Sequence, residues 1–204
     1  MTKQQKISRK DQILQSLAQM LELAPGVKIT TATLAKEVGV SEAALYRHFP
    51  SKARMYEDLI KFIEETLLTR INRIIKEETT ANVRCEKILT LILTFNAKNP
   101  GMTRILTGDA LVGENQRLRV RVTSLFNRIE SLLKKVLREA QIKENLKPPI
   151  SSGALANLLL ACCEGRLSQF VRSEFKQSPL ENWDLQWQYL ETNLLQPFMS
   201  DFSS

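Results

Sequence analysis

Cysteine, histidine and long apolar runs are scarce in this chain of 204 residues. The three cysteines, Cys85, Cys162 and Cys163, do not stand at the spacing of a zinc site, and the adjacent pair lies in an apolar helical run. We therefore expect buried thiols in a reducing compartment, without a structural disulfide. His48 is the single histidine and has no Asp, Glu or Cys cluster beside it, so the sequence predicts neither a metal site nor a histidine general base.

Motifs that carry catalytic chemistry are also missing. The chain has no glycine-rich phosphate loop, no nucleophile elbow and no paired carboxylates, so we expect no catalytic residues, no cofactor and no enzyme activity. The polar N-terminus lacks the apolar core of a signal peptide, and no stretch approaches about 18 uninterrupted apolar residues. These features predict a cytoplasmic protein that does not insert into a membrane.

Basic charge is concentrated in the first quarter of the chain. The formal net charge is +7, and residues 1–55 hold nine Lys and Arg against four Asp and Glu, whereas the remainder holds twenty against eighteen. Such asymmetry favours a polyanionic partner for the N-terminal part. Lys3, Lys6, Arg9 and Lys10 are consistent either with an arm that follows phosphates or the minor groove, or with a solvated tail.

Apolar residues recur with a helical period throughout, and no strand pattern is evident, so the expected fold is all-α. We expect an N-terminal helix-turn-helix domain over residues 1–52 and a helical dimerisation and partner-binding domain over residues 53–204. The first helix should begin near Ser8, whose spacing to Asp11 resembles a capping box, and end at Pro25. Further helices are expected from Lys52 to about Glu78 and over Val83–Phe95, Met102–Leu106, a short turn near Leu111, Glu114–Ile142, Ser152–Ser173 and Leu180–Met199.

Residues 29–52 predict two short helices joined by a sharp turn. Thr30 is placed to cap the first helix, and Ser41 is placed to cap the second. Ile29 with Leu34, and Val40 with Leu45, have the spacing of a hydrophobic staple. Because Gly39 can adopt the left-handed conformation that ends a helix, this segment predicts a helix-turn-helix.

The second of these helices sorts its side chains by face. Leu45 and Phe49 fall on one side, and Ala43 and Arg47 fall on the other. On the outward side, Ala43 and Ala44 allow close approach to base edges, and Arg47 has donors for a guanine or a phosphate. Polar groups suited to phosphate oxygens are Thr31, Thr33, Ser41, Tyr46, His48 and Lys52. The alternative is that Tyr46 and His48 are ordinary half-buried residues, Ser41 only a cap and Lys52 a solvated charge.

The pattern Ser-x-x-x-Leu-Tyr-x-His-Phe-x-Ser-Lys, here Ser41 to Lys52, resembles the DNA-binding end of the TetR family. The resemblance implies a homodimer on palindromic double-stranded DNA, with one or several dimers per site. A two-fold dimer would also present two recognition helices to successive major grooves. The last two expected helices carry broad apolar faces suited to pairing across the axis, or to internal packing alone: Leu155, Leu158, Leu159, Cys162, Leu167, Phe170, Trp187, Leu190, Leu194 and Leu195.

Segments outside the helix-turn-helix extend the resemblance to the nucleoid occlusion factors of the TetR family. These are Asn99–Gly108 and Phe170–Lys176, together with Ile29–Ala32 and Val38–Lys52. The resemblance implies a nucleoid-associated protein that binds specific chromosomal DNA and inhibits assembly of the tubulin-like cell-division GTPase. A ligand-responsive TetR-type transcriptional repressor is the alternative.

For this partner, the resemblance implies a groove between the fourth and fifth helices that accepts the C-terminal tail of the GTPase. The implied contacts are Phe62, Arg70, Leu91, Lys98 and Asn99. Lys98 stands where the family has arginine, and Thr94 stands where it has glycine. Lysine keeps the charge but lacks the planar fork of arginine, and the threonine side chain would narrow the groove. From the pattern alone, Phe62 and Leu91 are also consistent with the core.

Overall fold

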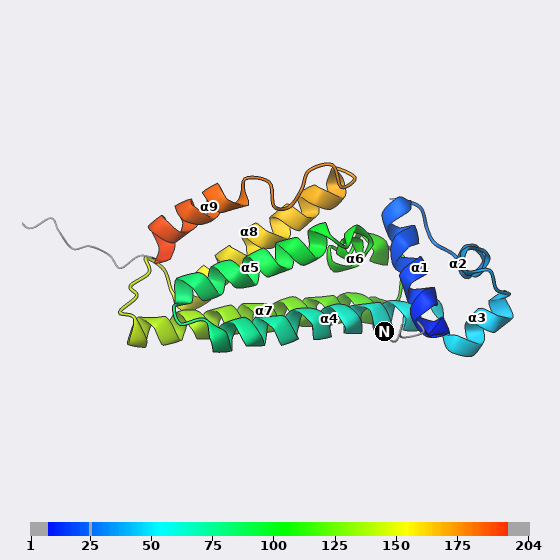
Figure 1. Cartoon of the computed structure of the whole chain (residues 1–204), viewed down its shortest axis with the longest axis horizontal. Helices are drawn as coiled ribbons and strands as arrows, with labels where there is room; N and C mark the ends of the chain where they lie inside the picture. Colours follow the sequence, from blue (N-terminus) through cyan, green and yellow to red (C-terminus); the bar gives the residue numbers. More distant parts are fainter. Residues whose placement is uncertain (1–7, 25, 196–204) are drawn as a thin grey trace, which may run out of the picture. The chain divides into compact units, whose positions relative to one another are not determined.

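A computed structural model gives the structure of residues 8–24 and 26–195, which form helices and no strand. Figure 1 shows these helices in chain order. They are α1 (Arg9–Leu23), α2 (Thr31–Val38), α3 (Glu42–His48), α4 (Lys52–Glu77), α5 (Ala81–Ala97), α6 (Pro100–Leu106), η1 (Asp109–Leu111), α7 (Gln116–Lys143), α8 (Ser152–Arg172), α9 (Trp183–Leu190) and η2 (Glu191–Leu195). No helix of the described residues is long and apolar enough to cross a membrane.

The all-α prediction is confirmed, and most expected helices agree with the structure within a few residues. The last expected helix differs at its start. Asn182 has a left-handed conformation with φ of 56°, so α9 begins at Trp183, three residues later than expected. A π-helical turn follows over Glu191–Leu195, and the expected end at Met199 lies outside the described residues.

Contacts divide the chain into two units at positions other than the expected boundary after residue 52. The first unit holds the residues up to Glu64 together with Asn99–Val122, and the second holds Glu65–Lys98 and the residues from Thr123 onward. α4 and α7 contribute residues to both units. The first unit extends beyond the helix-turn-helix because α6 packs against α1.

In the first unit, α1 and α6 approach so closely that one contact requires glycine. A Cβ atom added to Gly101 would lie 2.0 Å from the Ala18 carbonyl oxygen and 3.1 Å from the Glu22 nitrogen. Next on α6, the buried Arg104 donates to the Leu21 carbonyl at 2.7 Å and the Ala24 carbonyl at 3.1 Å. These bonds satisfy carbonyls that the end of α1 leaves open. Figure 1 shows α6 beside the end of α1.

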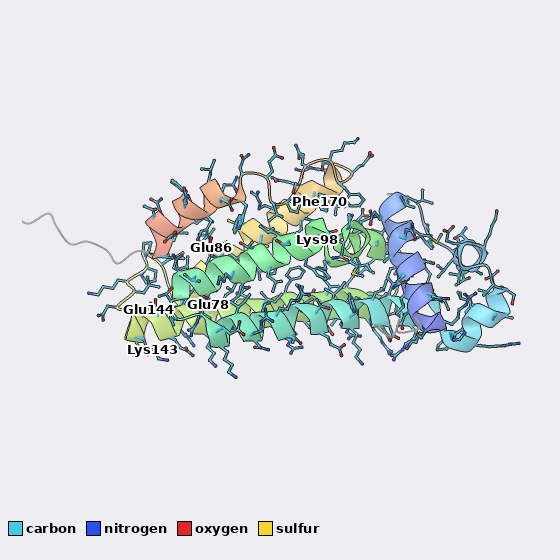
Figure 2. All side chains as sticks on the ribbon, in the orientation of Figure 1. Glu78, Glu86, Lys98, Lys143, Glu144 and Phe170 are labelled. Carbon is cyan, nitrogen blue, oxygen red and sulfur yellow. The ribbon has the colours of Figure 1, made fainter. Side chains whose placement is uncertain are left out.

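In the second unit, α5 is the most buried helix, as its many-sided apolar pattern predicts, and it packs on α8. Thr80, at the N-cap of α5, makes no capping bond through its side chain. Instead, both carboxylate oxygens of Glu144 accept the Ala81 N–H, at 3.0 and 3.1 Å (Figure 2). A carboxylate at this position satisfies an open donor and favours the helix dipole.

Most of the apolar face predicted for the last two helices packs inside the chain. Leu155, Leu159, Leu167, Phe170, Trp187 and Leu195 are all buried. Trp187 and Trp183 form a tilted ring pair at 5.9 Å, and Trp183 donates to Thr90 on α5. Leu158 on α8, and Leu185 and Tyr189 on α9, remain exposed. Internal packing therefore accounts for the larger part of this face.

Replacing Gly101 by Ala should destabilise the fold by about 2 kcal/mol, because the added methyl meets backbone atoms that cannot rotate away. Urea unfolding of the full chain measures this change. Gly153→Ala is the matched control, since its Cβ would meet only the flexible end of Lys134 at 3.5 Å, and it should change the unfolding free energy by less than about 0.5 kcal/mol. Equal stability of the two variants would contradict the close approach of α1 and α6.

Candidate nucleic-acid interface

The helix-turn-helix forms through the caps that the sequence predicts. The Ser41 hydroxyl accepts the Ala44 N–H at 3.2 Å, and Thr30 and Thr33 form a reciprocal capping box. Gly39 ends α2 in the left-handed conformation, with φ of 71° and ψ of 41°. The angle between α2 and α3 is thus specified by groups within twelve residues of one another.

The faces of α3 are also sorted as predicted. Leu45 and Phe49 are 0% exposed and anchor the helix on α1 and α2. Ala43, Arg47 and His48 are exposed on the rest of its surface. The small side chain at Ala43 leaves the backbone of the first turn accessible to a groove, and the Arg47 guanidinium has no hydrogen bond or ion pair with any described residue.

Two predicted phosphate contacts take part in a small network between α2 and α3. The Thr31 hydroxyl donates to the Glu42 carboxylate at 2.8 Å, and the Tyr46 hydroxyl donates to Thr31 at 3.4 Å. The second bond is long for two hydroxyl groups and therefore weak. Breaking it to bind a phosphate would cost the Tyr46 hydroxyl little interaction energy. Tyr46 is 45% exposed, so its ring is accessible from the outer side of α3. Thr33, in contrast, already uses its hydroxyl in the capping box.

Lys52 is held within the protein rather than extended into solvent. Its ammonium lies 2.5 Å from the Glu114 carboxylate and 5.6 Å from the centre of the Tyr56 ring. A DNA phosphate would have to compete with Glu114 for this ammonium. Glu114 lies 62 residues further along the chain, and no local pattern points to the pairing.

Two residues of the basic N-terminal segment belong to α1 and not to an arm. Arg9 donates to the Val38 carbonyl at 3.3 Å, and Lys10 pairs with Asp58 at 2.6 Å while lying over the Phe49 ring. Arg9 therefore links α1 to the end of α2, and Lys10 links α1 to α4 and to the end of α3. Lys3 and Lys6 lie outside the described residues.

The residues expected to bind the division protein are divided between the two units, and each is described in its own unit. Phe62 in the first unit is 50% exposed, so it is not a core residue. Arg70 in the second unit is exposed and makes no ion pair with a described residue, and Leu91 is half-buried. Lys98 is exposed at the end of α5 (Figure 2). Asn99, the N-cap of α6, is half-buried.

The thiols are placed as the sequence predicts. Cys85 and Cys163 are buried and Cys162 is half-buried, all three as free thiols. Burial raises the pKa of the Cys85 thiol to about 12, with a smaller contribution from Glu144, and burial also raises the pKa of Cys163. The neutral thiol is therefore the stable form of both side chains. No cluster of His, Cys, Asp or Glu among the described residues is placed to hold a metal ion.

Family comparisons agree with this arrangement. The model of the bacterial regulatory proteins of the tetR family matches residues 26–59, and a model described as a tetracyclin repressor-like C-terminal domain matches residues 76–196. The nucleoid occlusion factor SlmA of Marinomonas sp. (strain MWYL1) is 59% identical over 190 residues, which are 93% of this chain and 96% of the relative. The chain belongs to the SlmA family of nucleoid occlusion factors, within the TetR family.

A second relative and the solved structures extend the comparison. SlmA of Shewanella amazonensis (strain ATCC BAA-1098 / SB2B) is 57% identical and covers 96% of this chain and 100% of its own length. The MbdR regulator from Azoarcus sp. CIB matches with a TM-score of 0.79 over 93% of this chain and 100% of its own, at 15% identity. FadR from Bacillus subtilis, in complex with stearoyl-CoA, matches with a TM-score of 0.71 over 90% and 98% of the two chains, at 17% identity. These two structures show the shared fold alone.

We expect Tyr46→Ala to weaken DNA binding by about 1 kcal/mol on specific and unrelated duplexes alike, because phosphate contacts carry no sequence information. Lys52→Ala should weaken binding to both duplexes less, because Glu114 already pairs with the Lys52 ammonium. Arg47→Ala should instead reduce the preference for the specific duplex. Fluorescence anisotropy on both duplexes measures these effects, and the exposed Lys147→Ala in the other unit is the control for a lost charge. Unchanged binding by all three variants would contradict the outward orientation of α3.

A triple variant in which Cys85, Cys162 and Cys163 are each replaced by Ala should leave DNA affinity unchanged, provided that circular dichroism shows a folded chain. The reason is that none of the three lies in the helix-turn-helix and two are buried as neutral thiols. The same anisotropy titration tests this. Stoichiometric zinc in the purified protein, lost on chelation together with DNA binding, would contradict the expectation.

Proposed function

We propose that this chain is a nucleoid occlusion factor: it binds specific chromosomal DNA and, from there, inhibits assembly of the tubulin-like cell-division GTPase. The observation that carries the proposal is that relatives with this name are 56–59% identical over nearly the whole chain, including the residues after the helix-turn-helix. The helix-turn-helix supports the DNA part, because the capped α3 offers an unpaired Arg47 beside small residues.

DNA recognition would use a two-fold dimer on a roughly palindromic site. One α3 of seven residues reaches few base edges, whereas two of them about 34 Å apart read successive major grooves. The exposed side of α8 is suited to the pairing surface. Its outward residues Ala154, Leu158, Ala161 and Gly165 are small or apolar and recur every three or four positions, so a second helix can approach closely.

The C-terminal tail of the division GTPase would bind the helical domain that follows the helix-turn-helix. The long helix α4 carries both Phe62, an exposed aromatic ring, and Arg70, an exposed cation. Eight residues correspond to just over two helical turns, so the two side chains lie about 80° apart around the helix axis. An apolar anchor next to a cation fits a short peptide that combines apolar and acidic residues. The family resemblance implies the same partner for Leu91, Lys98 and Asn99.

Substituting Arg70 by Asp should abolish binding of the GTPase tail peptide and leave affinity for specific DNA within about twofold, because the new carboxylate repels an acidic peptide and lies outside the helix-turn-helix. Anisotropy with a labelled tail peptide and with the duplex measures both affinities in the full chain. Lys76→Asp is the control: it reverses an exposed charge of the same helix that lies about 9 Å further along the axis from Arg70 and about 21 Å from Phe62.

Tail binding lost in both variants would indicate a general effect of charge, and tail binding retained by a folded Arg70→Asp would refute the groove assignment. Loss confined to Arg70→Asp supports the groove. Since the DNA titration is carried out on the same samples, a failure of the partner site is distinguishable from a failure of DNA recognition.

A further inference from the structure

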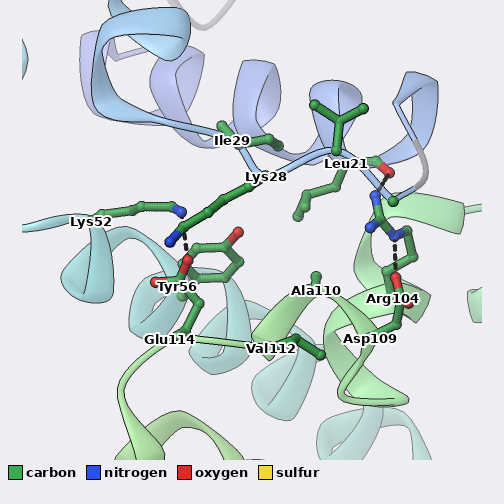
Figure 3. A pocket seen from close by; sticks show the side chains of 12 residues that line it. Leu21, Lys28, Ile29, Lys52, Tyr56, Arg104, Asp109, Ala110, Val112 and Glu114 are labelled. Carbon is green, nitrogen blue, oxygen red and sulfur yellow. Dashed lines mark hydrogen bonds and ion pairs between the residues drawn. The ribbon is translucent and has the colours of Figure 1, made fainter.

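A cavity of about 380 Å³ opens within the first unit (Figure 3). Its walls come from the loop between α1 and α2, the first two turns of α4, and the segment from Arg104 to Glu114. Leu21, Val27, Ile29, Ala110 and Val112 give it apolar surface on several sides. A volume of this size, lined about equally by apolar side chains and by charged or hydroxyl-bearing ones, is within the range of small-molecule sites.

Four of the charged groups at the cavity neutralise one another. The Lys52 ammonium and the Glu114 carboxylate lie 2.5 Å apart, with side chains 17% and 11% exposed. The Arg104 guanidinium binds Asp109 at 2.5 Å, in addition to its bonds to the end of α1. Two cations against two anions leave no net charge, so these pairs by themselves call for no charged ligand.

The Tyr56 hydroxyl has no such partner. Tyr56 is 1% exposed, yet its hydroxyl makes no hydrogen bond with any residue that the structure describes. Figure 3 shows the ring inside the cavity, with its oxygen directed toward the side that Lys28 and Ile29 line. Burial raises the pKa of this hydroxyl, so it remains a neutral donor. The hydroxyl is thus a donor that faces the cavity, and a ligand with an acceptor oxygen would bind it.

Lys28 is the remaining charge at the cavity. It is exposed, and its ammonium has no ion pair or hydrogen bond with a described residue. With the other four charges paired, Lys28 gives the lining a net charge of about one positive unit. A ligand that meets both this ammonium and the Tyr56 hydroxyl therefore carries an anionic acceptor group.

We propose that this cavity binds a small organic carboxylate, whose anionic head meets Lys28 and the Tyr56 hydroxyl and whose aliphatic part packs against Leu21, Ile29 and Val112. The site is separate from the proposed contacts to the division GTPase, and carboxylate binding does not depend on that partner. Its lining includes Ile29 and Lys52, which lie at or next to the positions where α2 and α4 begin.

Methyl spectra of the full chain, titrated with octanoate, test the proposal. Octanoate should bind saturably and shift the methyl signals of Ile29 and Val112, and octanamide, which has the same chain without the charge, should bind roughly tenfold more weakly. Tyr56→Phe removes only the hydroxyl, and Lys28→Gln removes only the charge. Each should weaken octanoate binding roughly two- to tenfold, the effect of one lost hydrogen bond or exposed contact to an ion. Lys147→Gln, an exposed charge in the other unit, should have no effect.

Three results would overturn the proposal. The first is the absence of saturable octanoate binding at concentrations up to roughly 10 mM, the limit of weak specific binding. The second is equal affinity for octanoate and octanamide. The third is octanoate affinity that remains unchanged in both Tyr56→Phe and Lys28→Gln while the chain stays folded.

Discussion

The guanidinium of Arg104 joins three segments on which the rest of the DNA-binding unit depends. It binds the Leu21 and Ala24 carbonyls at the end of α1 and the Asp109 carboxylate beside η1, and it is only 3% exposed. Removing a partner from a buried cation is strongly unfavourable, so these three bonds favour the packing of α6 on the end of α1. The absence of a Cβ atom at Gly101 permits the close approach of the two backbones that accompanies these bonds.

Interactions between neighbours in sequence were predictable, and those between distant residues were not. The caps at Thr30 and Ser41 and the turn at Gly39 depend on groups a few residues away, so the sequence specifies the helix-turn-helix and its outward face. Lys52 is expected from the sequence to contact a phosphate. In the structure its ammonium pairs with Glu114, which lies just before α7 and 62 residues further along the chain. Helical periodicity likewise identifies an apolar face without naming what covers it. The sequence alone therefore leaves a partner and internal packing both open for α8 and α9, and in the structure most of these apolar residues are buried within the chain.

The two proposed macromolecular sites differ in how the fold prepares them. On α3, the apolar side is fully buried and fixed, and the exposed side is left with small residues and an unpaired cation, which favours close approach to a negatively charged groove. On α4, Phe62 and Arg70 are exposed on a helix whose buried side includes Leu59, Ile63, Leu67 and Ile71. In each case the buried apolar side fixes the helix backbone, so binding has to order only the exposed side chains.

The central claim is that the DNA-bound chain acts on the division GTPase, and sedimentation of GTPase polymers tests it most directly. The purified GTPase is assembled with the full chain, with and without the specific duplex, and a scrambled duplex serves as the control. The account predicts that the chain bound to its specific duplex lowers the amount of pelleted polymer. Polymer that pellets unchanged, under conditions where anisotropy shows the chain saturated with the duplex, would contradict it and favour a transcriptional repressor.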